Sequence, residues 1–142
     1  EVRNESKVVI TKELERYYHP VGFLKEIELR EAYAASELVL SRAGSGSIFE
    51  IAALGKPSVL VPLALAAQDH QVKNAYAYAD CSRGAALVIE EANLTPHFLL
   101  EKIKYIFAIP GELEKMSKAA KSFAKPASGR LIAEYIMNYY KK

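Results

Sequence analysis

The sequence predicts an α/β domain built on a parallel sheet with helices on both faces. Short, continuously apolar runs alternate with helical patterns through the first two thirds of the chain, which is typical of strands buried on both faces. The chain has 142 residues, of which 51% are apolar, so it is long enough for one domain with a sizeable core. A glycine- and serine-rich turn also joins one apolar run to a helical pattern, as in many ligand-binding α/β domains.

Five apolar runs are expected to form strands, because each is short, apolar and bounded by turn or helix signals. They are Lys7–Thr11, Val21–Leu24, Glu37–Ser41, Ser58–Pro62 and Ala85–Ile89.

Helical spacing of apolar residues predicts helices over Glu28–Ala35, Ser47–Leu54 and Asp69–Asp80. Gly55 is expected to end the second of these, and Asp69 to cap the third. The inward face of the third helix is predicted to carry Val72, Ala75, Tyr76 and Ala79.

From about residue 95 the chain is expected to be helical to its end. Thr95 followed by Pro96 opens this region, and Pro110–Gly111 interrupts it. Two later stripes predict one helix on each side of Pro126; they are Leu113, Met116, Ala120 and Phe123, then Leu131, Ile132, Tyr135, Ile136 and Tyr139.

The turn before the second predicted helix suits an anion. Gly44 and Gly46 permit backbone angles that other residues resist, and Ser45 and Ser47 are good helix N-caps. A helix that starts near Ser47 directs free N–H groups and its positive dipole end at this turn. Glu50 lies one turn inside the helix, where a carboxylate suits hydrogen bonds from sugar hydroxyls, although Glu50 alone is also compatible with a solvated helix residue.

Three loops follow predicted strands and are expected to meet at one edge of the sheet. They are Leu24–Ile27, Arg42–Ser47 and Leu63–Asp69. Ligands of parallel α/β sheets bind at the carboxyl ends of strands. The sequence therefore predicts a ligand site where these loops converge.

Composition excludes several other classes. A single cysteine excludes an internal disulfide, and no run of eighteen apolar residues or signal peptide is apparent. The histidines His19, His70 and His97 lack the spacing of metal ligands, so no metal site is expected. The net charge of +2 argues neither for nor against nucleic acid, and no nucleic-acid partner is expected.

Several segments carry a resemblance to a known family. The stretch RAGSGSIFEIAALGKPSVLVPL, the following DHQVKNA, the preceding AYAASELVLSRAGS and the terminal ASGRLIAEYI resemble the donor-binding half of the MurG-type glycosyltransferases of family 28. The similarity covers about Val21 to the C-terminus. It implies a Rossmann-like domain, the C-terminal half of a two-domain GT-B enzyme that transfers N-acetylglucosamine (GlcNAc) from UDP-GlcNAc to undecaprenyl-pyrophosphoryl-N-acetylmuramoyl-pentapeptide in peptidoglycan synthesis.

The resemblance also implies roles for individual residues. Those expected to bind the donor are Phe23 and Leu24 at the uracil, Gly44, Ser45, Gly46 and Ser47 at the phosphates, Glu50 at the ribose hydroxyls, and His70, Gln71 and Asn74 at the sugar. Arg42 shares the motif and either joins this set or braces the loop.

The chain departs from the family pattern at its N-terminal side. It contains no GGSxG-type phosphate loop and no acceptor domain, which is the part expected to carry the catalytic base and the membrane-contacting patch. The expectation is thus a single truncated donor-binding domain over residues 1–142, soluble and inactive alone, with no catalytic residue of its own. The full-length enzyme is expected at the cytoplasmic face of the plasma membrane, where it binds the lipid-linked acceptor.

The implied reaction is an inverting displacement at the anomeric carbon, with helix-terminal N–H groups stabilising the leaving diphosphate and no metal or cofactor. Two alternatives remain at this point. One is another enzyme on the same architecture: a lipid-linked sugar transferase with a different donor, a two-subunit transferase whose donor half is a separate chain, or a sugar-nucleotide epimerase. The other is a non-catalytic module that binds a nucleotide, or a protein through its basic C-terminal helices.

Overall fold

The computed structural model describes residues 12–64, 69–81 and 84–140. The chain divides into two compact units, Glu1–Ala32 and Tyr33–Lys142. The strand predicted over Lys7–Thr11 lies outside the described residues.

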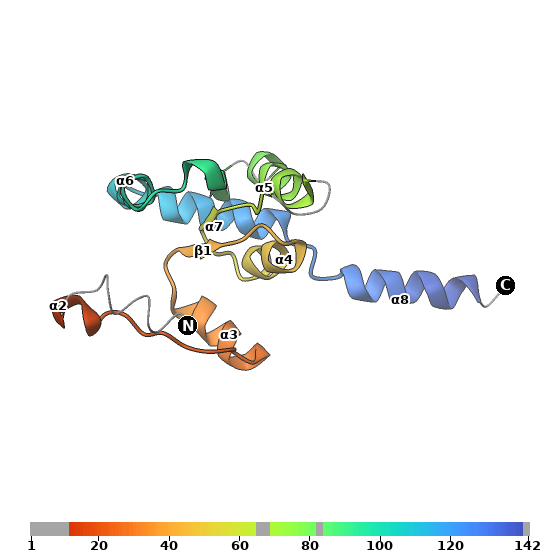
Figure 1. The fold of residues 1–142 in the computed structure, drawn as a ribbon. Helices are drawn as coiled ribbons and strands as arrows, with labels where there is room; N and C mark the ends of the chain where they lie inside the picture. Colours follow the sequence, from red (N-terminus) through yellow and green to blue (C-terminus); the bar gives the residue numbers. More distant parts are fainter. Residues whose placement is uncertain (1–11, 65–68, 82–83, 141–142) are drawn as a thin grey trace. The chain divides into compact units, whose positions relative to one another are not determined.

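The described part of the first unit contains α2 (Lys12–Glu15) and the start of α3 (Glu26–Ala35) (Figure 1). The strand predicted over Val21–Leu24 is wrong, because this segment has no strand pairing. A strand needs a neighbour for its ladder of hydrogen bonds, and the described residues of this unit contain none.

The helix α3 begins two residues before the predicted start at Glu28. The Lys25 N–H donates to Glu28 Oε2 at 2.8 Å, and the Leu29 N–H donates to the Lys25 carbonyl at 2.8 Å. A glutamate that reaches back from the third helical position to the cap residue is half of a capping box. This contact satisfies a backbone donor at the helix start and so accounts for the earlier boundary.

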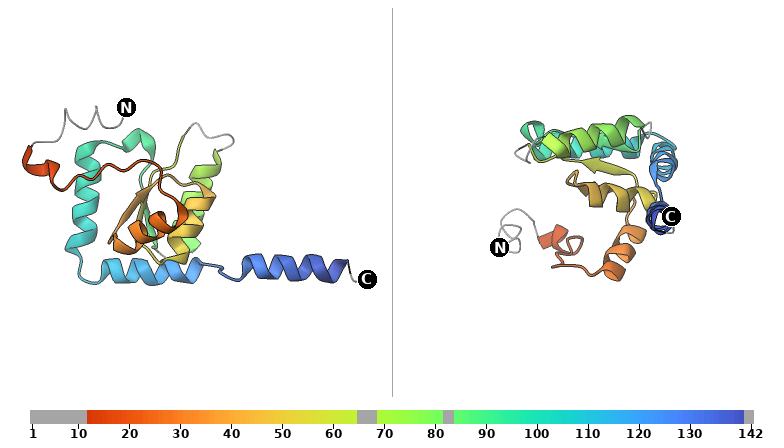
Figure 2. Two further views of the ribbon diagram at one scale, coloured as in Figure 1. Left: turned by 90° about the horizontal axis from the view of Figure 1, so that it is seen from below. Right: turned by 90° about the vertical axis from the view of Figure 1, so that its right-hand side faces the viewer.

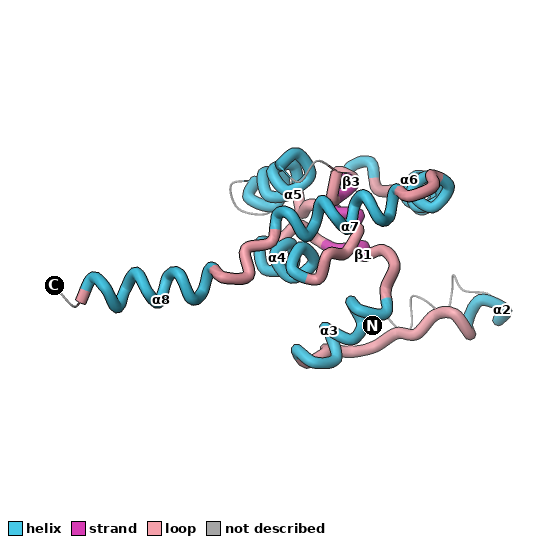
Figure 3. Tube along the Cα trace, turned by 180° about the vertical axis from the view of Figure 1, so that it is seen from behind, coloured by secondary structure: helices cyan, strands magenta, loops and turns pink. Residues whose placement is uncertain are grey.

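The second unit is built on a three-stranded parallel sheet. Its strands are β1 (Val39–Ser41), β2 (Ser58–Leu60) and β3 (Ala86–Val88), in that order across the sheet. The register places Leu40 beside Val59, and Val59 beside Leu87. In Figure 3 the strands, in magenta, lie at the centre of this unit with helices around them. The prediction of a parallel sheet is confirmed, with strands shorter than expected.

Helices connect the strands and continue to the C-terminal end of the described chain (Figures 1 and 2). They are α4 (Ser45–Ala53), α5 (His70–Cys81), the short 3₁₀ helix η2 (Glu91–Asn93), α6 (Pro96–Ala108), α7 (Glu112–Phe123) and α8 (Ser128–Tyr139).

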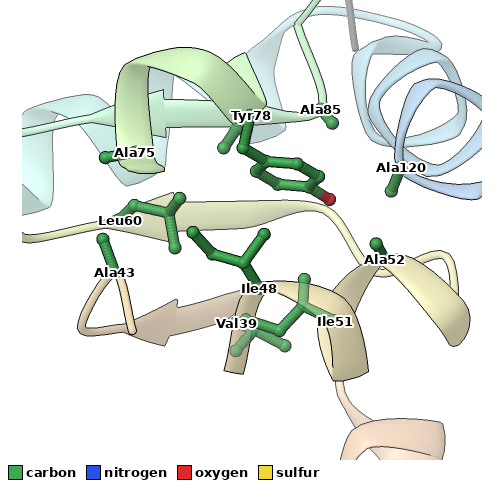
Figure 4. Close-up of a cluster of buried hydrophobic side chains, with 11 residues drawn as sticks. Val39, Ala43, Ile48, Ile51, Ala52, Leu60, Ala75, Tyr78, Ala85 and Ala120 are labelled. Atoms are coloured by element: carbon green, nitrogen blue, oxygen red, sulfur yellow. The ribbon is translucent and has the colours of Figure 1, made fainter. Parts of the chain in front are cut away.

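Helices cover both faces of the sheet, as predicted. Successive side chains in β2 and in the residue that follows it alternate between the two faces of the sheet. Leu60 therefore joins one buried cluster, while Val59 and Val61 join another. The first cluster lies among the sheet, α4, α5 and α7 (Figure 4). The second lies among the sheet, α6 and α7, and its buried residues are Val59, Val61, Ile89, Ile106 and Met116.

Tyr78 of α5 occupies the middle of the first cluster. Its side chain is fully buried, and Figure 4 shows its ring beside Ile48. The ring makes an edge-to-face contact with Phe123 of α7, with centroids 4.9 Å apart. Burial raises the pKa of Tyr78 to about 12, so its hydroxyl stays neutral. The predicted inward face of α5 is therefore right at Ala75 and wrong at Tyr76, which is exposed.

Gly55 ends α4 as predicted, through a left-handed turn. Its φ is +63°, the Gly55 N–H donates to the Ala52 carbonyl, and the Lys56 N–H donates to the Ile51 carbonyl. These two bonds form a Schellman motif, which favours glycine at this position. A Cβ on Gly55 would also lie 2.4–2.9 Å from the side chain of Lys121.

The predicted boundaries of the C-terminal helices are also confirmed. The Thr95 hydroxyl accepts from the Phe98 N–H at 3.2 Å, Pro96 is the first residue of α6, and Gly111 separates α6 from α7 with φ of 77°. Met116 and Ala120 of α7 are buried, whereas every residue of α8 is exposed.

Gly55→Ala is expected to lower the free energy of unfolding by about 1–2 kcal/mol, the cost of placing a side chain in the left-handed region. Urea unfolding of the chain measures this effect. Gly129→Ala is the matched control, because Gly129 lies inside α8 and a Cβ there would meet nothing within 4 Å. The control is expected to be neutral or stabilising, and equal midpoints for both variants would contradict the role assigned to Gly55.

Candidate functional site

The helix α4 presents its N-terminus at the carboxyl end of β1. It begins at Ser45, with Gly44 as its N-cap at φ −64° and ψ 143°, and no side chain caps it. The predicted start near Ser47 and the predicted capping by serine are therefore wrong. The first N–H groups of a helix have no partner within it, so this turn presents N–H donors and the positive dipole end.

The two glycines of this turn, Gly44 and Gly46, face open space. Both have negative φ values, so neither uses the unusual backbone angles that glycine permits. A Cβ at either position would meet nothing within 4 Å. The backbone beside both glycines is therefore open to an approaching ligand.

Two carboxamides of α5 fasten the loops that follow β1 and β2. Gln71 Oε1 accepts from the Leu63 N–H at 3.1 Å, after the end of β2. Asn74 Nδ2 donates to the Ala43 carbonyl at 3.4 Å, one residue before Gly44. The loop convergence predicted for Arg42–Ser47 and Leu63–Asp69 is thus confirmed through Ala43 and Leu63, while residues 65–68 of the second loop lie outside the described residues.

Arg42 joins the same edge of the sheet. Its Nη1 donates to the Val61 carbonyl at 3.5 Å, and its Nη2 pairs with Glu91 Oε1 at 2.8 Å. The other oxygen of Glu91 accepts from the Ala64 N–H at 3.4 Å. Arg42 therefore braces the loops, one of the two roles expected for it.

Glu91 was missed by sequence reasoning, although a signal for it exists. It follows the predicted strand Ala85–Ile89 by two residues, so the rule that located the loops after β1 and β2 also points to this acid. Its neighbour Glu90 accepts a hydrogen bond from the Tyr76 hydroxyl at 2.8 Å, which joins α5 to the end of β3 and raises the pKa of Tyr76.

Two other predicted residues lie on the helices that begin after β1 and β2. Glu50 is exposed on α4, and its charge adds to the effect of burial in raising the pKa of Tyr33. His70 is exposed at the first position of α5. Asp69, the expected cap of α5, has a φ of 56°, which is not the extended conformation of an N-cap.

The structure thus joins Arg42, Gln71 and Asn74 to the loops after β1 and β2, next to the open turn of α4. Phe23 and Leu24 belong to the first unit, in the segment before α3, and their expected role stays a prediction. The prediction of a third contributing loop at Leu24–Ile27 stays a prediction.

A hollow of about 270 Å³ lies at the opposite edge, before β1 and β2, and none of the predicted site residues lines it. Its lysine, Lys56, already donates to the carbonyls of Ala34 and Ser36 at 3.0 Å each.

Within the described ranges no three or more His, Cys, Asp or Glu side chains are grouped as a metal site would require. Likewise, no helix in this part of the chain has the length and apolarity needed to cross a membrane.

A parallel sheet with helices on both faces and a helix N-terminus at the carboxyl edge of its strands defines a Rossmann-like domain. The model of the glycosyltransferase family 28 C-terminal domain matches residues 3–131, and the chain belongs to this family. The resemblance inferred from the sequence is thereby confirmed.

Known relatives agree with this assignment. The chain is 36% identical over 134 residues to the UDP-N-acetylglucosamine–N-acetylmuramyl-(pentapeptide) pyrophosphoryl-undecaprenol N-acetylglucosamine transferase of Anaeromyxobacter sp. (strain K), a match that covers 91% of this chain and 34% of the relative. It is 42% identical over 111 residues to the enzyme of the same name from Chlorobaculum parvum, covering 75% of this chain and 30% of that relative. The crystal structure of Acinetobacter baumannii MurG matches with a TM-score of 0.72 and 29% identity, over 83% of this chain and 34% of that one. The chain therefore spans about a third of the length of these proteins.

The Arg42–Glu91 contact predicts a pH dependence. The hydrogen bond from Arg42 lowers the pKa of Glu91 below its ordinary 4.5, so the contact is fully formed above pH 4.5 and is lost as the pH falls through the lowered value. NMR titration of the Glu91 carboxyl and the Ala64 amide is expected to show one midpoint below 4.5. In Arg42→Met this midpoint should rise, whereas that of Glu114, which pairs with Lys118, should not move. An unchanged titration midpoint of Glu91 in the Arg42→Met variant would contradict the Arg42–Glu91 contact.

Proposed function

We propose that this chain is the donor-binding part of a glycosyltransferase that transfers GlcNAc from UDP-GlcNAc to undecaprenyl-pyrophosphoryl-N-acetylmuramoyl-pentapeptide. The observation that carries the proposal is the N-terminus of α4, which no side chain caps and which lies beside the open positions Gly44 and Gly46, in a chain of this family. A diphosphate is the ligand that such a turn binds well, because several backbone N–H groups and the helix dipole act on it together. The names of the relatives supply the sugar and the acceptor.

In this proposal the donor lies along the carboxyl edge of the sheet. The N–H groups of Ser45, Gly46 and Ser47 hold the diphosphate, and Glu50, farther along the same helix, accepts hydrogen bonds from the ribose hydroxyls. The sugar hydroxyls bind to three side chains at the start of α5, which are His70, Gln71 and Asn74.

The loop contacts of Gln71 and Asn74 are compatible with this second role. Gln71 uses its carbonyl oxygen for the Leu63 N–H, and a carboxamide also carries two donor hydrogens on its nitrogen. Asn74 uses one of its own two donors for the Ala43 carbonyl. Each side chain therefore keeps hydrogen-bonding capacity for a ligand while it fixes the loop beside that ligand.

The proposed chemistry is an inverting displacement in which the acceptor hydroxyl attacks the anomeric carbon as UDP leaves. This chain contributes orientation of the donor and stabilisation of the charge that develops on the diphosphate. We place the catalytic base outside this chain, in the part of the enzyme that the relatives have and this sequence does not cover. Backbone donors and the helix dipole supply the positive potential, so the proposal needs no metal or cofactor.

The acceptor and the cellular location belong to the same proposal. An undecaprenyl chain stays in a membrane, so the enzyme must work at a membrane surface to reach the pyrophosphate-linked sugar. We propose peripheral association with the cytoplasmic face of the plasma membrane, through the part of the enzyme outside this chain.

Glu50→Ala is expected to weaken UDP binding by about 1–3 kcal/mol, the size of a hydrogen bond to a charged group. Isothermal calorimetry with UDP and the intact gene product measures this. Glu101→Ala removes another exposed carboxylate, from α6, where it pairs with Lys104 at 3.7 Å, and is expected to leave UDP binding unchanged. Unchanged binding in Glu50→Ala would contradict the ribose contact.

The intact gene product is also expected to prefer UDP-GlcNAc to UDP-galactose and UDP-glucose. The names of the relatives specify N-acetylglucosamine, and a site whose polar groups pair with one sugar leaves some of them unpaired with an analogue that lacks the N-acetyl group or has an inverted hydroxyl. Transfer to a lipid-linked acceptor, measured with each donor at equal concentration, tests this preference. Equal rates with all three donors, or interconversion of the sugar nucleotides without transfer, would overturn the proposed function in favour of another donor or an epimerase.

A further inference from the structure

We propose that Glu91 is a positioning residue of the donor site, an inference that rests on the proposed function. Its carboxylate bridges the loop that carries the open turn of α4 and the loop that Gln71 holds. Glu91 does not contact the donor in this proposal; it sets the distance between the two loops that do.

The geometry of Glu91 supports this role because each oxygen serves a different loop. Oε1 accepts from Arg42 Nη2 at 2.8 Å, after β1, and Oε2 accepts from the Ala64 N–H at 3.4 Å, after β2. Glu91 itself follows β3 at the start of η2. One carboxylate therefore joins segments that follow all three strands.

Both bridged segments lie next to proposed ligand contacts. Arg42 is two residues before Gly44, and Ala64 follows Leu63, whose N–H binds Gln71. A shift of either loop would move the α4 turn relative to the start of α5. Misplacement of reacting or binding groups by about 1 Å can cost a factor of about 10² in activity.

The bridge is expected to affect binding more than stability. The side chains of Arg42 and Glu91 are 49% and 35% exposed, and ion pairs this exposed contribute little to unfolding free energy. A substitution at Glu91 should therefore change donor affinity while the unfolding midpoint stays close to that of the parent.

A simpler electrostatic effect predicts the opposite sign. If Glu91 acted only as a negative charge near an anionic ligand, its removal would strengthen UDP binding. Glu90 is the matched control, since it is the adjacent carboxylate and accepts from the Tyr76 hydroxyl, not from Arg42 or Ala64. Glu90→Gln removes the same charge and keeps an oxygen that can accept from Tyr76.

The experiment compares the parent, Glu91→Gln and Glu90→Gln in the intact gene product by calorimetry with UDP and by urea unfolding. In Glu91→Gln one oxygen becomes an NH₂ group that faces an N–H donor, so one of the two contacts is lost. We expect UDP affinity to fall about tenfold, which corresponds to about 1.4 kcal/mol. Glu90→Gln should bind UDP as well as the parent or better, and all three proteins should unfold at similar urea concentrations.

The outcomes separate this inference from the proposed function. A parent that binds UDP while Glu91→Gln binds it equally well or more tightly would overturn the positioning role and leave the proposed function standing. Equal losses in Glu90→Gln and Glu91→Gln would also overturn it, because the Glu90 variant leaves the bridge intact. A parent that fails to bind UDP would overturn the proposed function and this inference together.

Discussion

The parallel pairing of the three strands is the constraint on which the site depends. Because Leu40, Val59 and Leu87 lie side by side and the strands run in the same direction, all three strands end at one edge. The segments after them therefore meet, although Arg42 and Glu91 are 49 positions apart in sequence. An antiparallel strand would send the following loop to the opposite edge and remove its contact from this set.

The hydrophobic core determines where the polar groups of α5 lie. Tyr78 is fully buried, and this fixes the rotation of α5 about its own axis. Positions four and seven residues earlier fall on nearly the same face of a helix, and these are Asn74 and Gln71. Burial of the tyrosine thus brings both carboxamides to the loops after β1 and β2, where their hydrogen bonds are made. A polar site is in this sense positioned by apolar packing two turns away.

Sequence reasoning succeeded where one residue type has one strong local reason. Gly55 was predictable because its left-handed turn favours glycine, and Thr95 because its hydroxyl caps a helix that proline opens. It failed where a choice depends on distant contacts. Apolar periodicity favours Tyr76 over Tyr78, and the contacts with α4 and α7 are what make Tyr78 the buried residue. The resemblance to the family implied roles in donor binding that the spacing of residues alone does not indicate, and those roles stay predictions.

Electrostatics explains how an acid can lie near a proposed diphosphate site. An unpaired carboxylate beside the N-terminus of α4 would oppose the helix dipole and repel an anion. Glu91 is instead paired with Arg42, which lowers its pKa and neutralises its charge locally. The positive potential at the turn then comes from backbone groups whose positions do not depend on a flexible side chain. Glu91 can therefore hold two loops together beside an anion, because the guanidinium of Arg42 that it positions also offsets the repulsion between its carboxylate and the anion.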